Sequence, residues 1–538
     1  MTTFAMDLAR GLLTWFFVIY TVIAVTHYVL QLRFAHLTYR RQRSPEFEAE
    51  FPDLPVPVDI IIPVFNEEPD LLEACIRSAL QQDHPGRVRV IVVDDGSPNR
   101  ARIEPVYAAA EKAGAIVIGS PRNVGKRRAQ ALALPRCTGE IVVTLDSDSV
   151  LAPDAVRRLT RQFRDPKVGA ATGFVDVANI TANLLTRVQR IRYWMAFNQE
   201  RAAQTRFRTV MCCSGPLAAY RLEVFRAVAE DYLGQRYGGV ECTYGDDRHL
   251  TNLILGAGYD TVFDAGAVAY THVPERLRQF LRQQLRWNKS FYRELIWTMP
   301  FIATRPWFSR FDLACQVAMP MMLTITAGTA LVVGTMGSPF YLLRYLALVA
   351  LAAFIRASYA AYRERDLRFY LFILYGYVSA FLLMSVRLVA LSTLADGRWG
   401  TRGGEAKRES GWARRFQARP LMPSAAGLGV VPVAVAQRPG LANPPEPPVI
   451  APPTPPPDEL FGSAWRAGLT TSQMSMTRPA VAIAPAAGTV APAPTAVGAE
   501  LGYVGPCRTC GFEPAGAARF CRRCGTPRAA SPGAAVPH

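Results

Sequence analysis

The stretch Ile141-Val142-Val143-Thr144-Leu145-Asp146-Ser147-Asp148 decides the fold, because it ends a short apolar strand in two carboxylates. Two earlier runs are also short and apolar. Val58–Val64 ends in a turn, and Val88–Val93 ends in Asp94-Asp95-Gly96-Ser97. Between those two runs, apolar side chains recur at helical spacing, at Leu71, Leu72, Cys75, Ile76, Ala79 and Leu80. The order strand, helix, strand predicts a β-α-β unit and therefore an α/β fold.

Acidic side chains follow two of these predicted strands. In open α/β sheets, ligands bind beyond the carboxyl ends of the strands, where Asp94, Asp95, Asp146 and Asp148 lie. Two carboxylates separated by one residue can hold a hard divalent cation, which can bridge the phosphates of a nucleotide. Surface loops also carry this pattern without a function. Its place directly after a buried strand favours a site for Mg²⁺ or Mn²⁺ at Asp146 and Asp148.

Three further segments carry side chains suited to a reaction at a diphosphate. Lys126 begins the basic run Lys126-Arg127-Arg128, which could bind a diphosphate or form a solvated face. Asp246 and Asp247 precede an apolar helical pattern, where a carboxylate could act as a general base or only cap the helix. The motif Gln283-Gln284-Leu285-Arg286-Trp287 lies in a basic, aromatic stretch, which is also typical of a helix on a membrane surface.

The composition argues against a simple soluble protein. The chain has 538 residues, a net charge of +17 and 50% hydrophobic residues. Residues 12–32 contain no charged side chain and are long enough to cross a bilayer, so we expect a membrane helix there. The basic cluster Arg33–Arg43 follows, which predicts an outside N-terminus and a cytosolic domain over residues 55–275. We further expect amphipathic interface helices at 276–310 and a transmembrane bundle at 311–395.

The number of predicted crossings conflicts with the position of the later motifs. The bundle contains three apolar runs, at 311–335, 341–361 and 369–394. If all three runs crossed the membrane after the first helix, residue 399 and everything after it would lie outside the cell. Either a late run is interfacial or re-entrant, or the stretch 294–310 inserts more deeply than its composition suggests.

The C-terminal part differs in composition from the rest. Pro420–Pro494 contains 17 of the 41 prolines, so residues 404–505 read as a disordered linker. After it, two Cys-x-x-Cys pairs predict one tetrahedral Zn²⁺ in a ribbon at 506–526; the four cysteines are Cys507, Cys510, Cys521 and Cys524. Two disulfides are the alternative, but the other six cysteines are scattered as in a reduced cytosolic domain. The basic ribbon suits a protein partner, with nucleic acid left open for the ribbon alone.

Seven motifs in one order resemble processive, membrane-embedded family 2 glycosyltransferases, and most of all hyaluronan synthase. The resemblance covers about residues 12–402 and implies a GT-A-type catalytic domain at a plasma membrane. The motifs are Pro63-Val64-Phe65-Asn66-Glu67, Asp94–Ser97, Asp146–Asp148, Ser214-Gly215-Pro216-Leu217, Gly245–Asn252, Gln283–Trp287 and Trp399-Gly400-Thr401-Arg402.

The resemblance also implies roles for residues of these motifs. Glu67, Asp94 and Asp95 would contact the uridine of a UDP-sugar. Lys126 and Arg286 would contact its diphosphate, beside the metal ion at Asp146 and Asp148. Asp247, paired with Asp246, would deprotonate the acceptor hydroxyl. The other substrate contacts would come from Trp287, Gln283, Ser214, Gly215, Pro216, and the gating loop at 396–403 with Trp399, Thr401 and Arg402.

The implied product is hyaluronan, made from UDP-GlcNAc and UDP-GlcA and extruded across the membrane. The related chitooligosaccharide synthases of nodulation carry a Glu-Asp pair in place of Asp246-Asp247 and lack Asn288-Lys289-Ser290, so this chain follows the hyaluronan pattern at both places. A chitooligosaccharide synthase that uses UDP-GlcNAc alone is the alternative. A transferase that glycosylates a lipid carrier and a non-catalytic scaffold are further alternatives. The other expected partners are the growing polysaccharide and membrane lipids.

Overall fold

The structure, a computed structural model, describes residues 2–336 and 340–396. The predicted linker at 404–505 and the predicted zinc ribbon with its four cysteines lie outside the described residues. So does the gating loop from residue 397 onward, including Trp399, Thr401 and Arg402.

One eight-stranded sheet forms the core of the α/β domain, with the strand order β3-β2-β1-β4-β7-β6-β10-β5. Strands β3, β2, β1 and β4 are parallel neighbours, whereas β7 runs antiparallel to both β4 and β6. The predicted β-α-β unit is therefore present. The strands are β1 (Val58–Val64), β2 (Val88–Asp94), β3 (Ile116–Gly119), β4 (Ile141–Thr144), β5 (Ser149–Leu151), β6 (Val168–Val177), β7 (Ala218–Arg221) and β10 (Asp260–Thr271), with a separate hairpin of β8 (Arg236–Tyr237) and β9 (Val240–Glu241).

Helices cover both faces of this sheet, which explains why β1 is apolar without alternation. Ile60 and Ile62 pack on one face with Leu72 of α3, whereas Ile61 packs on the other with Ala129 of α5. Full burial of each isoleucine contributes about 1.5–3 kcal/mol. The helices of the domain are α3 (Pro69–Leu80), α4 (Arg100–Lys112), α5 (Lys126–Ala133), α6 (Ala155–Thr160), α7 (Leu184–Met195), α8 (Ala202–Thr205), α9 (Leu222–Ala227), α10 (Ala229–Leu233) and α11 (Asp246–Gly256).

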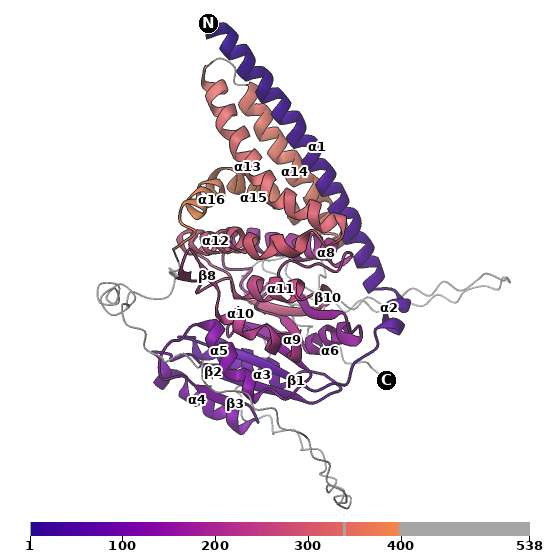
Figure 1. The fold of residues 1–538 in the computed structure, drawn as a ribbon, viewed down its shortest axis with the longest axis vertical. Helices are drawn as coiled ribbons and strands as arrows, with labels where there is room; N and C mark the ends of the chain where they lie inside the picture. Colours follow the sequence, from indigo (N-terminus) through magenta and orange to yellow (C-terminus); the bar gives the residue numbers. More distant parts are fainter. Residues whose placement is uncertain (1, 337–339, 397–538) are drawn as a thin grey trace, which may run out of the picture. The chain divides into compact units, whose positions relative to one another are not determined.

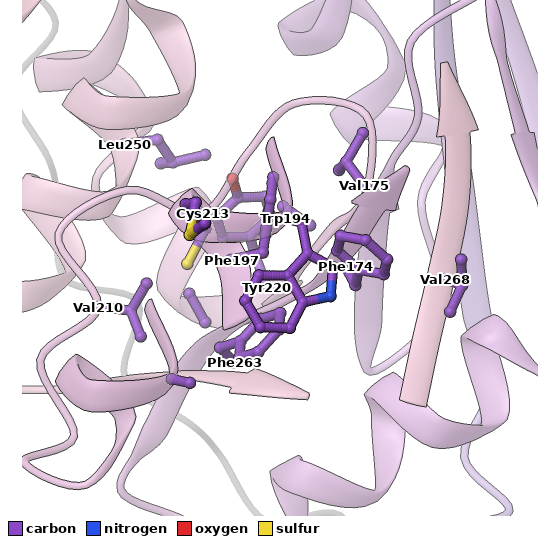
Figure 2. Close-up of a cluster of buried hydrophobic side chains, with 14 of the residues drawn as sticks. Phe174, Val175, Trp194, Phe197, Val210, Cys213, Tyr220, Leu250, Phe263 and Val268 are labelled. Carbon is purple, nitrogen blue, oxygen red and sulfur yellow. The ribbon is translucent and has the colours of Figure 1, made fainter. Parts of the chain in front are cut away.

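An aromatic cluster joins the sheet to the helix that follows β6 (Figure 2). A π-helical turn, Ala196–Arg201, connects α7 to α8 and places Phe197 between Phe174 of β6 and Phe263 of β10, with ring centroids 5.9 and 6.0 Å apart. Trp194 extends the same cluster to Phe369, at 5.1 Å, near the end of the chain's apolar part. The α/β domain and the late apolar helices therefore share one core.

In the part of the chain that the structure describes, four helical segments are long and apolar enough to cross a membrane: Thr14–Gln42, Trp307–Gly328, Leu342–Glu364 and Leu367–Ser392. The first lies in α1 (Thr2–Gln42), which extends well beyond the predicted run at 12–32. The helix continues because its end packs on the α/β domain: Gln42 Nε2 donates to the Phe263 carbonyl at 2.6 Å, and Phe34 lies against Phe207 at 4.8 Å. A short helix, α2 (Pro45–Glu50), then leads to the sheet.

The predicted interface helices at 276–310 are one helix, α12 (Leu277–Ile302), which lies between the sheet and the apolar helices (Figure 1). Two long helices follow, α13 (Trp307–Met336) and α14 (Phe340–Glu364). The end of α14 returns to the α/β domain, because Arg356 pairs with Glu200 at 2.8 Å and Glu364 accepts a hydrogen bond from Trp194 at 3.0 Å.

The last apolar run is not one straight helix. It consists of a 3-10 turn (Leu367–Leu371), α15 (Phe372–Tyr377), a π-helical turn (Val378–Leu382) and α16 (Leu383–Ser392). Directly before it, Glu364 contacts Trp194 of α7; directly after it, the Asp396 carbonyl accepts from Tyr244, which precedes α11. Both ends of the run therefore contact the α/β domain. Figure 1 shows α15 and α16 beside the part of α13 and α14 that is nearest the sheet.

Candidate active site

The carboxyl ends of β1, β2 and β4 lie side by side, as the parallel register requires. Val64 of β1 is paired with Asp94 of β2, and Ile61 is paired with Thr144 of β4. Asp94 is fully buried and accepts hydrogen bonds from the Ser97 backbone N–H at 3.0 Å and from Arg100 at 2.9 Å. This carboxylate shapes the turn after β2 and the start of α4.

Asp95 connects this turn to the basic segment that begins α5. One carboxylate oxygen accepts from the Val124 backbone N–H at 2.6 Å, and the other accepts from the Gly125 N–H at 3.0 Å. Gly125 has φ +91°, a conformation that favours glycine, and Lys126 follows it as the first residue of α5. Asp95 therefore holds the backbone directly before Lys126 in place.

Lys126 lies between two acidic motifs that are distant in the sequence. Its Nζ is 2.7 Å from Asp146 Oδ1, after β4, and 3.0 Å from Asp246 Oδ2, at the start of α11. Burial alone would lower the pKa of Lys126, but the two carboxylates raise it well above its ordinary value. Burial likewise opposes ionisation of Asp246, yet Lys126 holds its pKa below the usual range. This ion cluster joins the strand-end acids to the acidic pair.

The ion cluster fills the space that a side chain at position 215 would need, and this position is a glycine. A Cβ at Gly215 would lie 2.9 Å from Lys126 Nζ and 3.3 Å from Asp146 Oδ1. The segment Ser214-Gly215-Pro216 therefore passes directly against the cluster. Replacing Gly215 by a larger residue would displace the lysine or the loop.

Asp247 differs from its neighbour Asp246 in its surroundings. Burial, and next the charge of Asp246, raise the pKa of the Asp247 carboxyl. One of its oxygens accepts from the Arg248 backbone N–H at 2.8 Å, and the other accepts from the Cys212 thiol at 3.5 Å. Two adjacent carboxylates whose pKa values shift in opposite directions are suited to different tasks, and the one with the raised pKa is the better proton acceptor.

A third carboxylate joins the acids after β4. Glu67 accepts a hydrogen bond from the Ser147 hydroxyl at 2.8 Å. Asp148 accepts from Ser149 at 3.2 Å and from Thr271 at 3.3 Å. Burial, then the charges of Asp146 and Glu67, raise the pKa of Asp148 to about 7. A cation bound beside these carboxylates would offset their negative charge.

The carboxylates present fit a divalent ion whose remaining ligands would come from the substrate and from water. Within residues 2–336 and 340–396, no group of three or more His, Cys, Asp and Glu is placed to hold a metal ion. Asp146 and Asp148 supply two carboxylates, which suffices for Mg²⁺ where phosphate oxygens and water complete the coordination.

The motif Gln283–Trp287 lies on α12. Trp287 is 46% exposed, and its ring centroid is 6.2 Å from that of Tyr193 on α7. The carboxylates of Asp148 and Asp146 contribute to the raised pKa of Tyr193, after its burial, so this tyrosine is near the acids as well as near the tryptophan. Gln283 and Arg286 are half-buried on the same helix. The substrate roles of Gln283 and Arg286 stay predictions.

The sequence predicted no site role for three residues of this region, Tyr193, Arg201 and Cys212. Arg201 donates to the Ser214 hydroxyl at 2.9 Å and to the Cys212 carbonyl at 3.0 Å. Tyr193 lies near the end of α7, and Arg201 ends the π-helical turn that follows it. No local sequence pattern marks such a turn. For Cys212, its position next to the Ser214 motif was the available signal.

A mixed sheet of this order, with acids after β1, β2 and β4 and a helix-borne acidic pair, defines a GT-A-like glycosyltransferase domain. The Glycosyl transferase family 2 model matches residues 59–229. An N-acetylglucosaminyltransferase of Neorhizobium galegae is 39% identical over 351 residues, covering 64% of this chain and 80% of that protein. One of Rhizobium meliloti (strain 1021) is 39% identical over 354 residues, covering 65% and 82%. The chain belongs to glycosyl transferase family 2.

Among solved structures, mannosyltransferase PcManGT from Pyrobaculum calidifontis, in complex with GDP-Man and Mn²⁺, is similar with a TM-score of 0.47 and 22% identity, covering 68% of this chain and 98% of that one. This likeness is too distant to bear on function. The curated relatives correct one expectation: they support the alternative, a transferase of N-acetylglucosamine, better than hyaluronan synthase.

Proposed function

We propose that this chain is a membrane-embedded N-acetylglucosaminyltransferase that extends an oligosaccharide, using UDP-GlcNAc as its only donor. The observation that carries the proposal is the ion cluster of Lys126, Asp146 and Asp246, which joins the strand-end acids to the helix bearing Asp247. A donor bound at the strand ends would thus have its diphosphate beside a lysine and its sugar near a carboxylate with a raised pKa.

The proposed reaction is a single displacement that inverts the anomeric carbon. Asp247 accepts the proton of the acceptor hydroxyl, a new bond forms from that oxygen to the anomeric carbon, and the bond to the diphosphate breaks. Lys126 and Arg286 would balance the charge of the departing UDP, and Trp287 would hold the acceptor sugar against its ring face. Asp146 and Asp148 would hold Mg²⁺ or Mn²⁺, which when bound supplies positive charge to the diphosphate.

The choice of donor rests on the relatives, which are N-acetylglucosaminyltransferases. Asp246 and Asn288-Lys289-Ser290, which favoured hyaluronan in the sequence, have local tasks here that need no second sugar. Asp246 binds Lys126, and Ser290 lies directly against Gly245 at the start of α11.

A product assay tests this choice. We expect the purified full chain, given UDP-GlcNAc alone, to release UDP and to form chains that chitinase degrades and hyaluronidase does not. Adding UDP-GlcA should change neither the yield nor the digestion. Polymer that forms only with both donors and is cleaved by hyaluronidase would contradict the proposal, and transfer of one GlcNAc to a lipid would support the lipid-carrier alternative.

We also propose that α1, α13 and α14 cross the membrane and that residues 367–392 enter and leave it on the side of the α/β domain. The contacts of Glu364 with Trp194 and of Asp396 with Tyr244 support this path, because both ends of the run lie on that domain. Three crossings keep residue 396 on the side of the active site. This path corresponds to the first alternative given for the sequence, in which a late apolar run is re-entrant.

Protease treatment of intact spheroplasts tests the topology. With epitopes added before Met1 and after His538 of the full chain, we expect external protease to remove the first epitope and to leave the second. Permeabilised spheroplasts, in which both epitopes should be lost, provide the control. Loss of the C-terminal epitope from intact spheroplasts would show that residues 367–392 cross the membrane.

A further inference from the structure

Glu294 is a buried carboxylate on α12 to which the proposed reaction assigns no task. It is 2% exposed and lies two helical turns after Trp287, on the same face of the helix. Three side-chain donors converge on its two oxygens. Gln235 donates to Oε1 at 2.5 Å, whereas Asn252 at 3.0 Å and His249 Nδ1 at 3.2 Å face Oε2.

These donors come from two other parts of the domain, and each part leads to the ion cluster. His249 and Asn252 lie in the first two turns of α11, which begins with Asp246 and Asp247. Gln235 also accepts a hydrogen bond from Arg127, the residue after Lys126 at the start of α5. Glu294 is therefore bonded directly to α11 and, through Gln235, to α5.

A second contact fixes α11 against α12 one turn earlier. Gly245, which precedes Asp246 and has φ +85°, lies so close to Ser290 that any side chain at Gly245 would overlap the serine hydroxyl. Ser290 and Glu294 are one turn apart on α12, and Gly245 and His249 are one turn apart along α11. Two successive turns of each helix are thus matched, which defines the position of Trp287 relative to Asp247.

We propose that Glu294 is a positioning residue for the transfer reaction, holding α12, with Arg286 and Trp287, in register with the acidic pair on α11 and with Lys126 on α5. The inference rests on the proposed function, because it concerns the acceptor sugar and the base. Ionised Glu294 accepts hydrogen bonds only, which suits three converging donors. A glutamine in its place has one acceptor oxygen, and its amide would face one of the donors, so α12 must shift.

The test is Glu294→Gln in the full chain, assayed with UDP-GlcNAc for kcat, KM and the ratio of UDP released to GlcNAc incorporated. We expect KM to change less than kcat, because Glu67, Asp94 and Asp95 do not depend on Glu294, whereas Arg286 contributes most as charge develops on the departing UDP. We expect kcat to fall on the order of 10²-fold, as a displacement of about 1 Å does. The ratio should rise, because water replaces an acceptor that is held out of place.

A general loss of stability would lower kcat through fewer active molecules and would leave this ratio unchanged. Glu294→Asp keeps the carboxylate and should recover part of kcat, whereas Glu223→Gln, an exposed residue of α9, should behave as wild type. If Glu294→Gln fails to fold, Asn252→Ser, which removes one donor of the three, should raise the ratio in the same way. Folded variants at both positions with wild-type kcat and ratio would overturn the inference. A wild-type chain that releases no UDP would instead overturn the proposed function.

Discussion

Replacing Asp247 by asparagine is expected to lower kcat on the order of 10²–10⁴-fold, the usual contribution of a positioned general base. Asparagine has nearly the same shape and can keep the backbone contact with Arg248, but it cannot accept the proton of the acceptor hydroxyl. The neighbouring Asp246 remains bound to Lys126 and cannot take over. Incorporation of labelled GlcNAc measures kcat, and calorimetry with UDP should show unchanged binding.

The pH dependence of the wild type gives an independent measure of the same residue. Burial and the charge of Asp246 raise the pKa of Asp247, so its carboxyl becomes protonated at a higher pH than an ordinary aspartate. A protonated base is inactive, and kcat should therefore decline with falling pH before ordinary carboxyls titrate. Asp70→Asn, at an exposed position of α3, should keep wild-type kcat and this acidic limb. An Asp247→Asn variant with near-normal kcat would show that another group is the base.

Replacing Asp148 by asparagine is expected to abolish transfer at any concentration of Mg²⁺ or Mn²⁺. The substitution removes one of the two carboxylates proposed to hold the ion beside the diphosphate. The wild type should lose activity in a chelator and regain it when Mn²⁺ is added back, whereas the variant should not recover. Transfer measured across a titration of each ion gives the result.

The same substitution should make the metal-free protein more stable. Burial and the charges of Asp146 and Glu67 raise the pKa of Asp148 to about 7, so above that pH the folded chain holds an ionised carboxylate in an unfavourable place. Asparagine removes this charge, and the melting temperature in chelator at pH 8 should rise. Glu104→Gln, an exposed change on α4, is the matched control. A lower melting temperature for Asp148→Asn would indicate that the carboxylate contributes to folding.

The strands and their acidic ends could be predicted because both follow from local order. Ile60, Ile61 and Ile62 are consecutive apolar residues, which is typical of a strand covered on both faces, and they pack on opposite faces. Parallel strands then bring their carboxyl ends together, so Asp94 and Asp146 were expected at one edge. The long helix α1 was only partly predicted, since its polar end is helical through contacts with the α/β domain, such as that of Gln42.

The resemblance of the motifs to hyaluronan synthase indicated the family correctly, but it did not settle the product. The sequence favoured hyaluronan through Asp246 and the segment 288–290, whereas the curated relatives transfer N-acetylglucosamine. Both features are engaged in packing and in an ion pair, which shows why differences at motif positions are weak guides to the donor.

By itself, the sequence determined an α/β domain with acids at its strand ends, an apolar set of helices around it, and the residues from which a transferase site is built. Only the tertiary structure decided that Lys126 joins Asp146 to Asp246, that Arg201 contacts Ser214, and that Glu294 contacts α11 from α12. The physical reason is the range of the contacts. Periodicity and strand order are properties of neighbouring residues, whereas these ion pairs and hydrogen bonds form between segments that meet only when the chain is folded.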